Sequence, residues 1–145
     1  MVIANKLKRG ANVRVVSPAL SLQIISEETR SIANKNFSDL GLKVSFAKNS
    51  EEKDDANSST VNSRLNDIHE AFSNKEVEGI ITSIGGFNSN QLLQYLDYKL
   101  IKKNPKAFCG FSDITALLNA IYAKTGIVTY LGPHYSTFGI KKGNE

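Results

Sequence analysis

Apolar and polar residues follow two different spacings along the chain, and the changes between them divide it into strands and helices. Short apolar or alternating runs predict five strands, at residues 13–16, 42–46, 78–84, 106–111 and 127–131. Apolar residues at helical spacing predict helices at residues 32–40, 61–72 and 114–122, with two short ones between 92 and 101. Gly41 and Gly126 follow two of these helices, as glycine often does at a helix end.

The order of these elements predicts an α/β fold with a parallel sheet flanked by helices on both faces, of the flavodoxin or Rossmann type. In such a sheet, ligands bind beyond the carboxyl ends of the strands. Four of the loops at that end carry candidate functional residues. These are Ser17, Gly85-Gly86, Ser112-Asp113 and His134. We therefore expect these loops to share one rim.

Composition limits the function classes. The 145 residues, 41% hydrophobic and 22% charged, are typical of one soluble domain. No apolar run reaches the roughly 20 residues that span a bilayer, and the N-terminus shows no export signal. We therefore expect a cytoplasmic protein without a membrane partner, and the single cysteine, Cys109, fits a reducing compartment. The net charge of +4 is scattered among acidic residues, which argues against nucleic-acid binding.

Ser112 is the residue that most clearly points to chemistry, because it stands between an apolar strand and an amphipathic helix. One interpretation is a helix N-cap, a common role of serine. The other is a nucleophile on a tight turn, where the amide of Asp113 and the helix dipole face a developing oxyanion. Gly85 and Gly86 are either an ordinary turn or the source of a second amide for that oxyanion.

A serine nucleophile needs a base, and the sequence offers few candidates. His134 lies on the expected rim as a candidate for the base, whereas His69 falls on the helix at 61–72. Asp113 is better explained as support for the helix start, and Cys109 as a small buried residue in its strand. No His, Cys and carboxylate cluster has metal-ligand spacing, so we expect neither a metal nor a cofactor.

Five segments resemble the serine peptidase family of LD-carboxypeptidases and microcin C immunity peptidases. They are residues 13–18 (VRVVSP), 84–93 (IGGFNSNQLL), 95–98 (YLDY), 104–106 (NPK) and 110–126 (GFSDITALLNAIYAKTG). The resemblance covers essentially the whole chain. It implies that Ser112 is the nucleophile, and that the amide of Asp113 and one from Gly85-Gly86 form the oxyanion hole.

The resemblance also implies that the catalytic residues are distributed over two domains. Residues 1–145 correspond to the N-terminal, nucleophile-bearing α/β domain, and the family's catalytic glutamate and histidine belong to a C-terminal domain that this chain lacks. Residues 141–145 fall roughly where the connection between the domains would begin. We therefore expect the chain alone to be inactive and the full-length form to be a homodimer.

Two substrate classes follow from the resemblance. The family's cell-wall branch, which removes D-alanine from muropeptides, typically has glycine and arginine where this chain has Asn88 and Gln91. That difference favours the microcin-immunity branch, which confers antibiotic resistance by cleaving an aminoacyl or peptidyl group from a nucleotide. A muropeptide LD-carboxypeptidase is the alternative, and a non-catalytic binding or vestigial domain is the second. Ser17, Asn88 and His134 are candidates for a rim that contacts a small peptide or aminoacyl-nucleotide substrate.

Overall fold

A computed structural model describes residues 1–141, so the expected interdomain connection from residue 142 onward lies outside the described residues. These described residues form five strands and four α-helices in alternating order, with short 3-10 turns between them. The strands are β1 (Asn12–Val16), β2 (Lys43–Phe46), β3 (Gly79–Thr82), β4 (Ala107–Gly110) and β5 (Tyr130–Leu131). The helices are α1 (Glu27–Asp39), α2 (Val61–Ser73), α3 (Tyr98–Lys103) and α4 (Thr115–Thr125).

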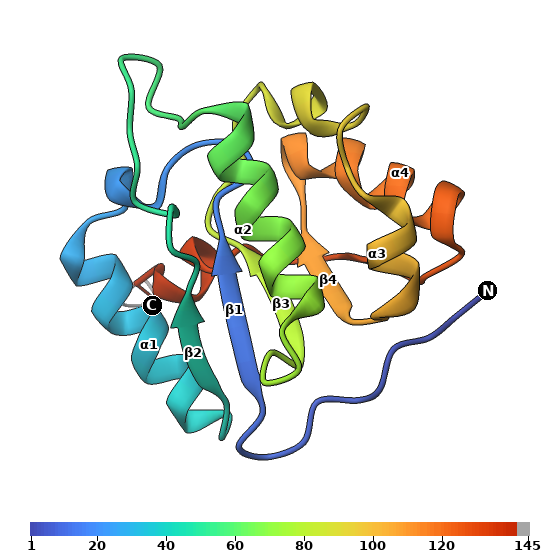
Figure 1. Ribbon diagram of the computed structural model, residues 1–145. Helices are drawn as coiled ribbons and strands as arrows, with labels where there is room; N and C mark the ends of the chain where they lie inside the picture. The colour runs from blue at the N-terminus through green and yellow to red at the C-terminus, as the bar shows by residue number, and fades with distance from the viewer. Residues whose placement is uncertain (142–145) are drawn as a thin grey trace.

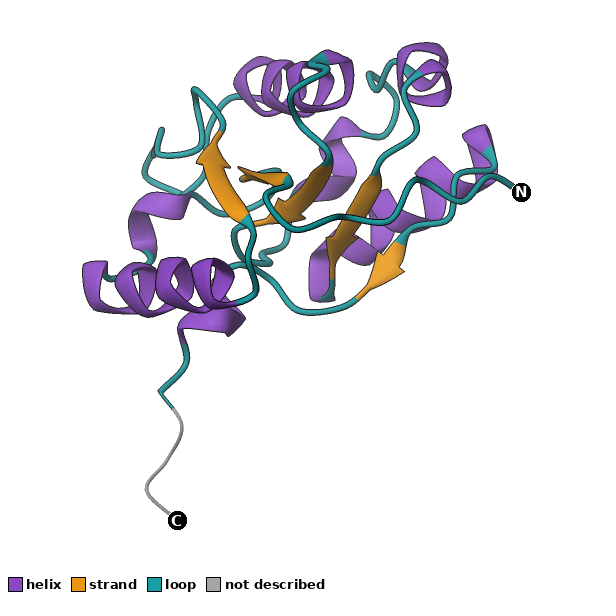
Figure 2. Ribbon diagram, turned by 90° about the horizontal axis from the view of Figure 1, so that it is seen from below, coloured by secondary structure: helices purple, strands orange, loops and turns teal. Residues whose placement is uncertain are grey.

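The five strands form one sheet in the order β2-β1-β3-β4-β5, and every neighbouring pair is parallel. This is the strand order of flavodoxin-like folds, whose ligand site lies where the order reverses. The register pairs Val15 with Ile81, and Ile80 with Phe108. Figures 1 and 2 show helices on both sides of the strands. The predicted parallel α/β fold is confirmed.

Alternate residues of the central strands supply two separate cores. On one face, Ile80 and Phe108 pack with apolar residues of α2, α3 and α4. On the other face, Val15 and Ile81 pack with α1 and with Tyr135, which is the N-cap residue of the 3-10 turn Ser136–Gly139. Because each strand is covered on both faces, it reads as an apolar run in the sequence, which is why β1, β3 and β4 could be predicted.

Polar caps set the helix boundaries. Ser26, Thr60 and Asp97 each accept a hydrogen bond from a backbone amide in the first turn of α1, α2 and α3. Gly126 ends α4 in the left-handed conformation, with φ of +76°. The apolar spacing placed the start of the first helix too late, because α1 begins with the polar residues 27–31.

The predicted strand at 127–131 is longer than the observed one. Only Tyr130 and Leu131 pair with β4, whereas Ile127 forms an isolated bridge with Val2. The amide of Val2 donates to the carbonyl of Gly126, and the amide of Val128 donates to the carbonyl of Val2. Residues 126–128 therefore pair with Val2 of the N-terminal segment, which is blue in Figure 1. No helix within residues 1–141 is long and apolar enough to cross a membrane.

Candidate active site

Ser112 lies directly beyond β4 on a sharp bend of the backbone. Its φ is +58°, in the left-handed region that side-chain-bearing residues seldom adopt, and its side chain is exposed. A 3-10 turn, Ser112–Ile114, leads from it into α4, and neither this turn nor α4 has a side-chain cap. The hydroxyl therefore does not serve as the N-cap that one interpretation of the sequence expected. A strained, exposed serine between strand and helix is the arrangement of a nucleophile elbow.

Small residues make this bend sterically feasible. A Cβ on Gly110, the last residue of β4, would collide with Thr82 and Ile114, so the backbone can approach β3 only with glycine there. Gly85 lies against the bend, where an added Cβ would stand 3.1 Å from Ser112 Cβ and 3.2 Å from its Oγ. The absence of side chains at these two positions lets the chain pass close to the Ser112 hydroxyl without blocking it.

Three backbone amides around Ser112 are available for a ligand. No hydrogen bond from the amides of Gly85, Gly86 or Asp113 is present within residues 1–141, and Gly85 and Gly86 line the hollow beside Ser112. Gly86 packs closely against Leu20 and Ala19, since an added Cβ would stand 2.9 Å from Leu20 Cγ and 3.0 Å from Ala19 Cβ. Free amides beside an exposed hydroxyl are what an oxyanion hole requires.

Asp113 links the loop after β3 to the bend after β4 through hydrogen bonds. Its Oδ2 accepts a hydrogen bond from the amide of Ser89 at 2.9 Å, and its carbonyl accepts one from the Ser89 hydroxyl at 2.9 Å. Ser89 is fully buried. Asp113 thus fixes the position of the loop after β3 relative to the bend after β4, rather than acting on Ser112 through its carboxylate.

Arg64 on α2 also links the rim loops through hydrogen bonds, and this role was not predicted from the sequence. Its guanidinium is buried and donates to the carbonyls of Pro18 and Asn88, both at 3.1 Å, and to Gln91 Oε1 at 2.6 Å. Burial lowers the pKa of Arg64. The sequence did contain a signal, because Arg64 falls three residues after Val61 on the helix face that packs inward.

Ser17 and Asn88 are buried rather than presented on the rim. The Ser17 hydroxyl bonds to that of Ser83 at 2.8 Å and accepts from the amide of Leu22 at 3.2 Å. Asn88 Nδ2 donates to the Ser58 hydroxyl at 2.9 Å. Both side chains therefore stabilise their loops through internal hydrogen bonds.

His134 is buried close to Ser112. Its Nδ1 bonds to Thr82 Oγ1 at 2.7 Å, and its ring stacks on Phe111 with 4.2 Å between centroids. Burial lowers the pKa of His134 to about 4, so the ring is neutral at pH 7. His69, by contrast, accepts a hydrogen bond from the amide of Asp97 at 2.9 Å, away from this rim.

The environment of Cys109 does not favour a nucleophilic thiolate. It is half-buried in β4, its Sγ lies 3.6 Å from the carbonyl oxygen of Pro133, and burial raises the pKa of its thiol. A raised pKa leaves little thiolate at neutral pH. Within residues 1–141 no three His, Cys, Asp or Glu side chains are grouped so as to hold a metal ion.

The surface around Ser112 is a shallow, mostly apolar depression. A hollow of about 310 Å³ is lined by Leu20, Ile84, Gly85, Gly86, Phe111, Ser112 and His134. An adjoining groove of about 530 Å³ shares Ile84, Phe111 and His134 with it and extends to the start of α1 at Ser26. The two together offer room for a small molecule bound across the hydroxyl.

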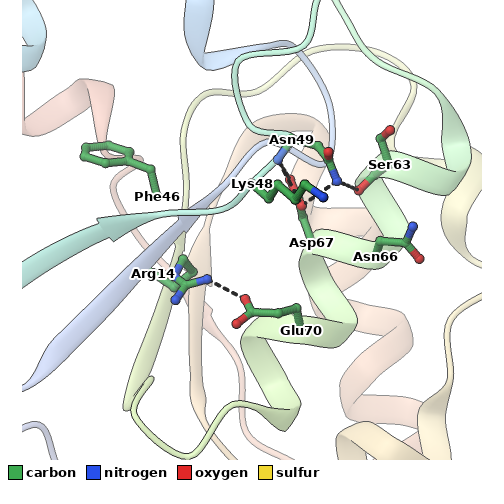
Figure 3. Close-up of a pocket in the computed structure, with 8 residues that line it drawn as sticks. All are labelled: Arg14, Phe46, Lys48, Asn49, Ser63, Asn66, Asp67 and Glu70. Atoms are coloured by element: carbon green, nitrogen blue, oxygen red, sulfur yellow. Dashed lines mark hydrogen bonds and ion pairs between the residues drawn. The ribbon is translucent and has the colours of Figure 1, made fainter.

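A separate hollow of about 540 Å³ lies between β2 and α2 (Figure 3). In it, Arg14 of β1 pairs with Glu70 of α2, and Asp67 accepts hydrogen bonds from the amide and side chain of Asn49. Burial raises the pKa of Asp67 to about 6. These charged and polar groups pair with each other, so they stabilise the contact between sheet and helix and leave Ser112 as the centre of the candidate site.

Comparison with known proteins identifies the family. Residues 13–132 match the family model described as the LD-carboxypeptidase N-terminal domain. The chain belongs to the LD-carboxypeptidase family of peptidases. YocD of Bacillus subtilis (strain 168), which carries a carboxypeptidase name, is 54% identical over 140 residues, covering 97% of this chain and 43% of YocD. The microcin C7 self-immunity protein MccF of Escherichia coli is 44% identical over 93 residues, covering 64% of this chain and 27% of MccF.

Solved structures of this family share the fold throughout the chain. A MccF-like protein from Bacillus anthracis str. Ames superposes with a TM-score of 0.97 at 55% identity, over 99% of this chain and 44% of that protein. MccF in complex with aspartyl sulfamoyl adenosine superposes with a TM-score of 0.92 at 33% identity, over 99% of this chain and 43% of MccF. The chain thus spans less than half the length of these relatives.

Proposed function

We propose that this chain is the nucleophile-bearing domain of a serine peptidase or amidase that cleaves an amide bond to an aminoacyl or peptidyl group, as in immunity to microcin C. The observation that carries the proposal is the left-handed backbone of Ser112, which holds an exposed hydroxyl against the Gly85-Gly86 corner. A strained residue of this kind persists only where the surrounding structure holds it, and such residues cluster at functional sites.

In the proposed reaction, Ser112 Oγ attacks the carbonyl carbon of the scissile amide while a base removes its proton. The carbonyl oxygen becomes an oxyanion and accepts hydrogen bonds from the amide of Asp113 and from Gly85 or Gly86. The intermediate then collapses, the amine departs with a proton, and an acyl ester on Ser112 remains. Water hydrolyses this ester and regenerates the hydroxyl.

The base is proposed to come from the region that the relatives have beyond their match with this chain. Within residues 1–141, His134 is a poor base, since its pKa of about 4 and its burial both limit proton uptake at neutral pH. We therefore expect the 145-residue chain alone to hydrolyse its substrate several orders of magnitude more slowly than a complete relative. The homodimer implied by the resemblance is likewise expected of the longer form.

Similarity to the microcin branch supports the proposed substrate class. MccF, which is 33% identical over 99% of this chain, has been solved in complex with aspartyl sulfamoyl adenosine, and this supports a small aminoacyl-nucleotide over a muropeptide. One observation keeps the second class open as an alternative function. A Bacillus subtilis protein named for murein peptide carboxypeptidase activity is 35% identical over 90% of this chain.

A chimaera tests the proposal. Residues 1–145 replace the matching region of the Bacillus anthracis MccF-like protein, and hydrolysis of an aminoacyl sulfamoyl adenosine and of a muropeptide is compared with that by the parent. We expect the chimaera to cleave the nucleotide compound, and the Ser112→Ala chimaera and the isolated chain to be inactive. Full activity of the Ser112→Ala chimaera would refute the assignment. A folded chimaera that binds both compounds and cleaves neither, beside an active parent, would favour a non-catalytic role.

A further inference from the structure

His134 and Ser112 border the same small space beside Gly85. A Cβ on Gly85 would stand 3.2 Å from Ser112 Oγ and 3.4 Å from His134 Nε2, so only a glycine leaves the gap between these atoms open. Both residues also line the 310 Å³ hollow. The two side chains come from loops after different strands, and the sheet order that places β3 beside β4 brings them together.

Nε2 of His134 is a buried polar atom that has no hydrogen-bond partner among residues 1–141. The residue is only 3% exposed. Leaving a buried nitrogen unpaired is costly, so native structures seldom retain one without a reason. A hydrogen-bond donor that reaches Nε2 of His134 would remove this cost.

The bonds around His134 are compatible with a proton on Nδ1. In that tautomer Thr82 Oγ1 accepts from His134 Nδ1–H at 2.7 Å, while the Thr82 hydroxyl points to the carbonyl of Cys109 at 3.4 Å. In the neutral ring Nε2 is then an acceptor. No charged side chain lines the hollow beside it, and burial is the sole cause of the ring's lowered pKa. The hydroxyl that borders Nε2 across the Gly85 gap is that of Ser112.

We propose that the Ser112 hydroxyl, which does not bond to His134 in the structure, donates a hydrogen bond to Nε2 of His134 after rotation about χ1, which makes His134 a positioning residue for the nucleophile. The inference rests on the proposed function, in which Ser112 attacks the substrate. The stack of the imidazole on Phe111 and its bond to Thr82 fix the acceptor in place. His134 thus limits the rotamers of the hydroxyl before the base of the complete protein takes its proton.

Histidine NMR on the 145-residue chain tests the pair directly, because the sequence has only two histidines. His69 is an internal reference, since its Nε2 already accepts from the amide of Asp97. At pH 7 we expect His134 to carry its proton on Nδ1. Ser112→Ala should shift its Nε2 resonance toward that of a free acceptor and leave His69 unchanged. Phe111→Leu is the control, because it hydrates the ring while keeping the hydroxyl. An Nε2 shift that ignores Ser112→Ala, or that moves as much in Phe111→Leu, would overturn the proposal.

A pair of substitutions separates the acceptor from its anchor. His134→Asn retains a donor near the Nδ1 position for Thr82 but has no group at Nε2, whereas His134→Gln reaches the Nε2 position and loses the anchor. In the active chimaera we expect His134→Asn to lower kcat about tenfold at constant KM, as loss of one hydrogen bond would, and His134→Gln to retain more of it. The reverse order would assign His134 a purely structural role. Since the NMR readout needs no hydrolysis, an inactive chimaera with an intact Ser112–His134 signal would count against the function alone.

Discussion

Replacing Ser112 by glycine and by alanine tests whether its backbone is strained. The φ of +58° places a Cβ-bearing residue in the left-handed region, whereas glycine adopts that region without penalty. Because the Ser112 side chain is exposed and caps no helix, its removal alone should change stability little. The comparison of Gly with Ala at this position therefore isolates the backbone.

The expected difference is the sum of two opposing effects. Relief of the left-handed strain favours Gly over Ala by about 1–2 kcal/mol. The greater freedom of glycine in the unfolded chain offsets about 0.5–1 kcal/mol of that. We expect Ser112→Gly to be more stable than Ser112→Ala by about 1 kcal/mol, which for a domain of this size raises Tm by roughly 3 °C.

Urea and thermal unfolding followed by far-UV circular dichroism would measure the difference, since the chain has no tryptophan to serve as a fluorescent probe. Asn57, the other non-glycine residue with positive φ, is the matched control. Asn57→Gly should gain less, because asparagine tolerates the left-handed region better than serine does. Equal or lower stability of Ser112→Gly relative to Ser112→Ala would refute the idea of a strained elbow.

Three further predictions concern the neighbours of Ser112 and the second hollow. Because the pKa of His134 falls to about 4, its neutral form stabilises the fold above pH 6.5, and about 3 kcal/mol is lost as pH falls to 4. In His134→Asn that loss should be absent from pH-dependent urea unfolding, and an unchanged pH profile would contradict the assignment. The pKa of Asp67 rises to about 6, so stability should instead fall by about 2–3 kcal/mol as pH rises from 4 to 7, and Asp67→Asn should remove this slope. Gly85→Ala places a methyl 3.2 Å from Ser112 Oγ and should lower kcat of the chimaera tenfold or more, because 1 Å of misplacement can cost about a hundredfold. Unimpaired turnover would show that the gap is not needed.

The sequence predicted the fold through features that depend on local chemistry. The central strands are apolar because both faces are covered, and glycine at position 126 ends α4 as expected. The short β5 was not foreseen, since its length depends on Val2 bonding to Gly126 and Val128 across more than 120 residues of sequence. No local pattern encodes a partner that far away.

For the site too, the sequence predicted what depends on local position and missed what depends on distant partners. Position at the carboxyl ends of parallel strands placed Ser112, Gly85 and His134 on one rim, and the structure brings them together. It could not show that Asn88 is buried, because its partners are distant in sequence: Ser58 bonds to its side chain and Arg64 to its carbonyl. Nor could it reveal the positive φ of Ser112, because serine seldom adopts that region and no local pattern marks it.

The most direct test of the nucleophile is to locate the covalent adduct. The active chimaera is treated with a fluorophosphonate, which phosphonylates an activated serine, and is then digested and examined by mass spectrometry. We predict one added phosphonyl group on the peptide that contains Ser112, blocked by prior incubation with substrate and absent from Ser112→Ala. An adduct on another residue that abolishes turnover while Ser112 stays unmodified would contradict the account.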